Sequence, residues 1–125
     1  MADPLGILLA SGTHDRAHFA FVAAAGAAAA GRAVVLFATN AGCRALLRDW
    51  SGLEGAARDE LVRARGVAGL DELRAAAEEL GVRLMACDAG LRAEGIEPGG
   101  LLPGVEVAGV PTFLGAVRGG QIASL

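Results

Sequence analysis

The chain has 125 residues, a formal charge of −3 and an isoelectric point near 5.3. Hydrophobic residues make up 54% and charged residues 20%, which excludes a disordered chain, because such chains lack the apolar side chains that offset ordering entropy. The length fits a single domain over residues 1–125. Only 4% of the residues are aromatic and much of the apolar content is alanine, so the core is thin and we expect a homo-oligomer.

Composition also excludes several kinds of chemistry and partner. Every basic residue is Arg, and a chain without Lys forms no Schiff base and has no P-loop lysine. No basic stripe is present, so we expect no nucleic-acid partner. The alanine-rich stretch 17–31 is too weakly apolar for a membrane span. Asp3 and Pro4 lie where a secretory signal peptide would carry positively charged residues. We therefore expect a cytoplasmic protein with no membrane partner and no cofactor.

In the first part of the chain, short apolar runs followed by small polar residues predict buried strands that lead into helices. In order, they predict a strand over 5–10, a helix over 14–30, a strand over 33–38 and a helix over 41–48. Ser11 or Thr13 would cap the first helix and Gly31 would end it. Thr39 and Asn40 would cap the second helix.

Segment 49–69 is the least regular part, and within it residues 56–65 are expected to be helical. Its charged residues are expected on one solvated face: Arg58, Arg63, Arg65, Asp59 and Glu60. The rest of the chain predicts, in order, a helix over 71–80, a strand over 82–87, a helix over 88–94, a strand over 105–109, a helix that starts at Pro111 and a strand over 121–125. This alternation predicts an α/β fold, a three-layer α/β/α sandwich with a mostly parallel sheet of about five strands.

Cys87 is the first candidate for chemistry, because ligands of open α/β sheets bind beyond the carboxyl ends of the strands. Cys87 ends a predicted strand and directly precedes a helix, so the amides of Asp88, Ala89 and Gly90 and the helix dipole would stabilise a thiolate. The charge of Asp88 acts against this. The alternative is an inert buried cysteine, since free cysteine is among the most buried residue types.

Cys43 and the two histidines are weaker candidates. The two cysteines lie far apart with no CxxC spacing, which excludes a disulfide-stapled or cysteine-rich zinc fold, and Cys43 is either a resolving thiol or a packing residue. His14 and His18 are four residues apart and share a helix face. Because no third ligand can be identified, we expect no metal site. We expect His14 to be a polar residue at the rim of the cleft and His18 to be half-buried in its helix.

The turn Ser11-Gly12-Thr13 precedes a helix and could bind an anion through its free backbone amides. It lacks the spacing of a dinucleotide fingerprint and of a P-loop, and ordinary helix capping explains it equally well. Together with His14, this turn is the expected opposite wall of a cleft at Cys87.

These motifs occur in an order that resembles the DsrE/DsrF-like family, which includes TusD-type sulfur-relay subunits. The resemblance depends on LLASGTHDRAHFAFVAAAGAAAAGRAVVLFATNAG, on GVRLMACDAGLRAEGI and on PGVEVAGVPTFLGAV. It implies a small α/β/α fold, assembly into a trimer, a hexamer or a hetero-oligomer, and a cytoplasmic location. It also implies that the cysteine matching Cys87 carries a persulfide and passes sulfur to a partner. Cys43 matches no catalytic position of the family.

The leading hypothesis is therefore a sulfur-relay protein, a sulfurtransferase that receives sulfur on Cys87 from a donor protein and gives it to an acceptor protein. A second hypothesis is a non-catalytic module that binds a small anion or nucleotide, or whose assembly is itself the function. A third is a thiol peroxidase that uses Cys87 and Cys43.

Overall fold

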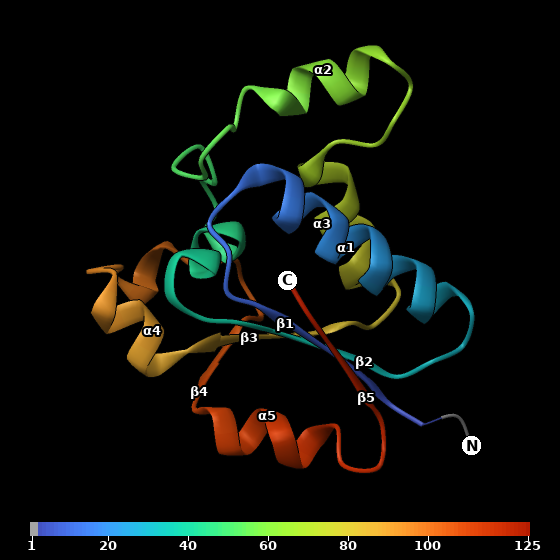
Figure 1. Cartoon of the computed structure of the whole chain (residues 1–125), viewed down its shortest axis with the longest axis vertical. Helices are drawn as coiled ribbons and strands as arrows, with labels where there is room; N and C mark the ends of the chain where they lie inside the picture. Colours follow the sequence, from blue (N-terminus) through green and yellow to red (C-terminus); the bar gives the residue numbers. More distant parts are fainter. Residues whose placement is uncertain (1–2) are drawn as a thin grey trace.

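The computed structural model describes residues 3–125, and its centre is one sheet of five parallel strands in the order β4-β3-β2-β1-β5 (Figure 1). The strands are β1 (Leu5–Leu9), β2 (Val34–Ala38), β3 (Arg83–Cys87), β4 (Glu106–Ala108) and β5 (Gln121–Ser124). The α-helices are α1 (His14–Ala29), α2 (Arg58–Ala64), α3 (Leu70–Glu79), α4 (Asp88–Ala93) and α5 (Val110–Ala116). Two 3₁₀ helices, η1 (Asn40–Leu46) and η2 (Pro98–Gly100), complete the order.

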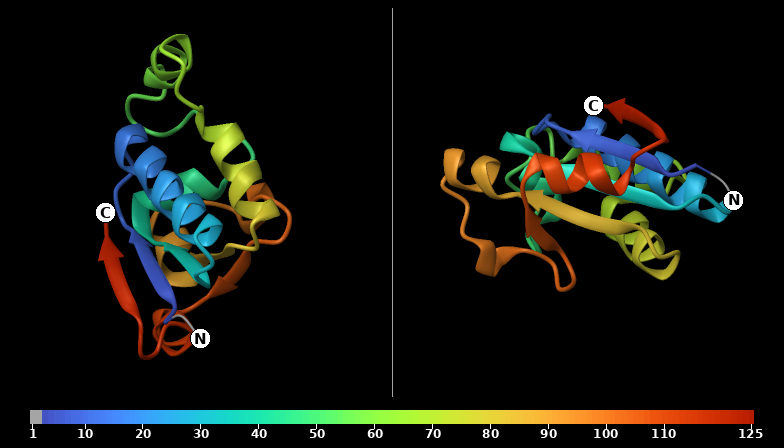
Figure 2. Two further views of the ribbon diagram at one scale, coloured as in Figure 1. Left: turned by 90° about the vertical axis from the view of Figure 1, so that its right-hand side faces the viewer. Right: turned by 90° about the horizontal axis from the view of Figure 1, so that it is seen from below.

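Helices cover both faces of the sheet, which confirms the predicted α/β/α layers. Helices α1 and α3 lie on one face and α5 on the other, as Figures 1 and 2 show. Alternate strand residues face opposite sides, so Leu36 and Ala38 of β2 belong to the core under α1 and α3, while Val35 and Phe37 belong to the core under α5. A strand buried on both faces needs a continuous apolar run, and this is why β2 could be predicted.

The segment after β2 differs from the prediction, because residues 40–46 form a 3₁₀ helix where an α-helix was expected over 41–48. Gly42 explains the tighter turn: a β-carbon there would lie 2.3 Å from the Leu9 carbonyl oxygen, so the chain must pass directly against the end of β1. Asn40 enters the turn with a φ of 50°, a conformation that Asn tolerates better than most residues. Thr39 is the N-cap but its side chain makes no capping hydrogen bond.

Segment 49–69 extends beyond the end of the sheet, and α2 is its helix (Figure 1). One of its predicted solvent-facing residues was assigned wrongly, since Asp59 is buried. Its neighbours Leu61 and Glu60 are exposed. Within residues 3–125, no helix combines the length and apolar character needed to traverse a lipid bilayer.

Candidate functional site

Cys87 lies where β3 ends and α4 begins, at the carboxyl edge of the sheet. It is the N-cap residue of α4, and its Sγ accepts a hydrogen bond from the Gly90 amide at 3.4 Å. The residue retains 9% of its surface in contact with solvent. Its side chain packs with Phe37, Met85 and Phe113 in the core under α5. The expected contact between the thiol and the start of the helix is thus present, and it involves the Gly90 amide.

The two charged residues beside Cys87, Asp88 and Arg92, form an ion pair with each other. Asp88 Oδ2 accepts from Arg92 Nη2 at 2.5 Å, one turn further along α4. This pair offsets the negative charge that Asp88 brings next to the sulfur. Ala89, the next residue, is exposed and presents no charge to the site.

Close packing against the end of β2 holds α4 in place. A β-carbon on Gly90 would lie 2.5 Å from the Asn40 nitrogen and 2.7 Å from Thr39 Oγ1. Such distances do not occur in real structures, so Gly90 must be glycine for α4 to lie this close to β2. An ion pair between Arg44 and Glu94, with Nη1 and Oε1 2.5 Å apart, joins η1 to the end of α4.

Cys43 has a different environment from Cys87. It is fully buried, belongs to the core under α1 and α3, and its Sγ donates to the Ala38 carbonyl at 3.5 Å. Burial raises the pKa of the Cys43 thiol to about 11. At neutral pH Cys43 is therefore an uncharged thiol without access to solvent, which favours the packing role over that of a resolving thiol.

The Ser11-Gly12-Thr13 turn lies at the end of β1, but its neighbouring backbone groups are already bonded within the chain. Ser11 Oγ accepts from the Thr13 amide at 3.2 Å and shares a hydrogen bond of 2.9 Å with Thr13 Oγ1. The His14 amide donates to the Glu54 carbonyl, and the Glu54 amide donates to the Gly12 carbonyl, both at 2.8 Å. The turn thus joins β1 to segment 49–69, and an anion-binding role for it stays a prediction.

Both histidines are more buried than expected and contact segment 49–69. His14 is fully buried, and its Nε2 lies 2.8 Å from Asp59 Oδ1. His18 is 8% exposed, and its Nε2 lies 2.8 Å from the Ala68 carbonyl oxygen. His14 therefore lies inside the structure, not at the lip of a cleft. Across residues 3–125, no group of His, Cys, Asp and Glu has the arrangement of a metal site.

The sequence did not indicate that Asp59 is buried and bonded to His14. Its Oδ1 accepts from the Leu70 amide at 2.8 Å, and its Oδ2 lies 3.3 Å from Arg63 Nε. Its partner His14 is 45 residues away in the chain, so no local spacing could have indicated the pair. The carboxylate packs closely against Gly69, where a β-carbon would lie 2.8 Å from Asp59 Oδ2.

The fold and the edge thiol define a class of small α/β protein with a nearly buried cysteine between a strand and a short helix. The chain belongs to the DsrE/DsrF/DrsH-like family, whose model matches residues 44–124. The matched part contains Cys87 and α4 and begins just after Cys43. The predicted resemblance is thereby confirmed.

Solved structures share the whole fold at low sequence identity. The protein of unknown function MTH1491 from Methanobacterium thermoautotrophicum is 19% identical with a TM-score of 0.66, covering 99% of this chain and 100% of that chain. The ychN protein from E. coli is 14% identical with a TM-score of 0.67, covering 100% of both chains. At these identities the likeness concerns the fold alone. Among curated proteins, none matches the chain.

Proposed function

We propose that this protein is a sulfur-relay protein that holds sulfur as a persulfide on Cys87 and transfers it to an acceptor. The observation that supports this most directly is the position of Cys87, the N-cap of α4 with its sulfur bonded to the Gly90 amide. The residue is buried except for 9% of its surface, which is the route by which a donor would reach it. An amide directed at a sulfur stabilises the negative thiolate, which is the nucleophile in sulfur exchange. Membership of the DsrE/DsrF/DrsH-like family adds support.

The transfer needs two exchange steps and no separate oxidant. In the first, the Cys87 thiolate attacks the outer sulfur of a donor persulfide, R–S–SH; a new S–S bond forms, the donor S–S bond breaks and R–S⁻ leaves. In the second, an acceptor thiolate attacks the outer sulfur of Cys87–S–SH, and the Cys87 thiolate leaves. In each step one sulfur atom and its proton pass from one thiol to the next, so the protein acts as a sulfurtransferase.

The proposed function also includes a location, an assembly state and partners. The protein works in the cytoplasm as one domain and assembles with copies of itself, as a trimer or hexamer, with donor and acceptor proteins as its partners. It needs no resident cofactor, since every step is thiol chemistry. The raised pKa and complete burial of Cys43 weigh against a peroxidase that would need Cys43 as a second thiol.

The test is sulfur loading of purified variants, measured as intact mass. After incubation with a small-molecule persulfide, the wild type and Cys43→Ser should each gain one sulfur atom, and added thiol should remove it. Cys87→Ser should gain none, because it lacks the attacking sulfur. Equal loading of the wild type and Cys87→Ser would refute the proposal.

A further inference from the structure

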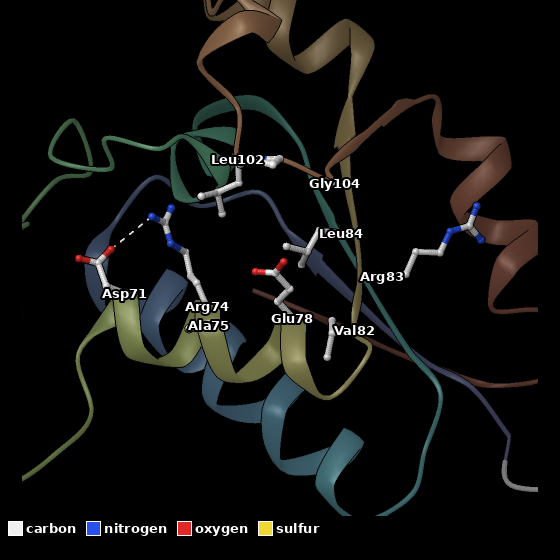
Figure 3. A pocket seen from close by; sticks show the side chains of 10 residues that line it. Asp71, Arg74, Ala75, Glu78, Val82, Arg83, Leu84, Leu102 and Gly104 are labelled. Atoms are coloured by element: carbon white, nitrogen blue, oxygen red, sulfur yellow. Dashed lines mark hydrogen bonds and ion pairs between the residues drawn. The ribbon is translucent and has the colours of Figure 1, made fainter.

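A hollow, unconnected with the thiol, lies at the amino end of β3, the end opposite Cys87. It has a volume of about 290 Å³ and lies between α3, the start of β3 and the turn that precedes β4 (Figure 3). Its apolar lining comes from all three parts: Ala75, Val82, Leu84, Leu102 and Pro103. The turn is fixed, since the Val105 amide donates to the Leu102 carbonyl at 3.3 Å and Gly104 has a φ of 87°. The hollow is therefore preformed.

The two cations that line the hollow are already engaged. Arg83 donates from Nε and Nη2 to the carboxylate of Glu106, at 2.5 and 2.9 Å. Arg74 is 7% exposed and donates to main-chain carbonyls at the end of η1 and to Asp71 Oδ1. Its Nε has no partner within residues 3–125 but is sealed from solvent. Neither side chain offers a free positive charge to a ligand.

The two carboxylates of the hollow differ from each other. Asp71 accepts from Trp50 Nε1 at 2.7 Å as well as from Arg74. Glu78 lies one turn after Arg74 on α3 and is exposed to solvent, and its side chain forms no ion pair within residues 3–125. Figure 3 shows its carboxylate directed from α3 towards the hollow, near Leu84. The uncompensated charge at the hollow is thus one negative charge.

From this arrangement we propose that the hollow binds a small primary ammonium compound with an apolar body. The ammonium group donates to Glu78, and the carbon chain covers Val82, Leu84 and Leu102. An anionic ligand would meet the Glu78 carboxylate without a free cation to balance it, and a neutral one would gain nothing from this exposed, hydrated carboxylate. The volume is near the lower end for small-molecule sites, which suits a ligand of about ten heavy atoms or fewer.

Three probes of equal chain length test the charge preference: hexylammonium, hexanol and hexanoate. Titrations are followed by the amide resonances of Ala75, Val82 and Gly104 in the full-length protein. Hexylammonium should bind most tightly and hexanoate most weakly. Glu78→Gln should weaken hexylammonium binding by about fivefold, the effect of losing one partly exposed ion pair, and should leave hexanol binding unchanged. Glu79→Gln, which alters the adjacent carboxylate outside the hollow, should bind like the wild type.

A second variant tests the place of binding. Ala75 is an exposed residue of α3 that lines the hollow, so Ala75→Leu should keep the fold, checked by circular dichroism, and fill the space. It should abolish the shifts caused by hexylammonium. Hexanoate binding as tight as that of hexylammonium, unchanged binding in Glu78→Gln or Ala75→Leu, or no shifts at all would overturn the proposal. Cys87→Ser should bind hexylammonium normally, so this result is independent of sulfur transfer.

Discussion

Asp59 is a buried carboxylate that joins α2 and the start of α3 to α1. Burial works to raise the pKa of Asp59, but the hydrogen bonds from His14 and the Leu70 amide, together with the Arg63 charge, outweigh it and hold that pKa below its ordinary value. A carboxyl whose pKa is lower in the folded state stabilises the fold when it is ionised. Its contribution is complete above the unfolded value of about 3.9 and is lost as pH falls through the lower folded value.

We therefore predict that Asp59→Asn destabilises the protein by about 1–3 kcal/mol at pH 7, the cost of weakening buried hydrogen bonds to a charged group. Urea unfolding measures this, and the difference from the wild type should shrink as pH falls below about 4. Glu60→Gln, one residue further along α2 and exposed, should change stability by no more than about 0.5 kcal/mol. Equal effects of the two substitutions, or a difference that is independent of pH, would contradict the role given to Asp59.

At the scale of elements, the contact between α4 and the end of β2 determines where the Cys87 sulfur lies. Gly90→Ala places a β-carbon against the Thr39–Asn40 peptide and should move α4 away, which lengthens the hydrogen bond from the Gly90 amide to Sγ. We expect a loss of about 1–3 kcal/mol in stability, as for other overpacked sites. The rate of Cys87 alkylation at neutral pH should fall as well, because the Gly90 amide no longer donates to the sulfur.

Gly26→Ala is the matched control for this change. Gly26 lies within α1 and a β-carbon there would meet nothing within 4 Å, so alanine should stabilise the helix by about 0.5–1 kcal/mol. The rate of Cys87 alkylation at neutral pH should stay that of the wild type. If Gly90→Ala also leaves both the alkylation rate and the stability unchanged, the packing of α4 does not position the thiol.

The regular elements could be predicted because their signals are local. Strands β1, β2 and β3 are short apolar runs between small polar residues, and α3 has acidic residues in its first turn. The 3₁₀ form of η1 was not predictable, since it depends on how closely Gly42 approaches the Leu9 carbonyl. That distance is a property of the packed sheet and leaves no trace in the spacing of residues 40–46.

For the candidate site, too, the sequence predicted the local features and missed the contacts between distant parts of the chain. Cys87 at a strand–helix junction was predictable from sequence, because the junction lies within a few adjacent residues. The close contact of Gly90 with Asn40, and the partners of His14, join parts of the chain that are 40 or more residues apart. Only the folded sheet brings such residues together, so the sequence assigned His14 to the surface and Asp59 to solvent.

At the scale of the whole molecule, the side of the sheet under α5 retains exposed apolar residues. Val110 and Leu114 lie one turn apart on α5, and each is nearly half exposed. Ile122 of the edge strand β5 is exposed too, and it pairs with Gly6, which itself faces Phe113 of α5. Neighbouring exposed apolar residues can form an interaction surface, and we expect this one to be an interface between copies.

We predict an oligomer, a trimer or hexamer, in light scattering at micromolar concentration. Leu114→Glu should shift the protein towards smaller species, because it places a charge in the apolar surface. Leu80→Glu, at a residue of similar exposure just beyond the last residue of α3, should not. A wild type that is monomeric at this concentration would contradict the prediction.

The pairing of β1 with β5 joins opposite parts of the chain. Leu5 lies in register with Gln121, and the Leu125 amide donates to the Leu8 carbonyl at 2.8 Å. Close packing continues at Gly120, where a β-carbon would collide with the Pro4 carbonyl oxygen. Contacts between residues so distant in sequence form late in folding. During synthesis on the ribosome, β1 must therefore wait for its second neighbour until residues 121–124 have emerged, and until then one side of this strand has no hydrogen-bonding partner.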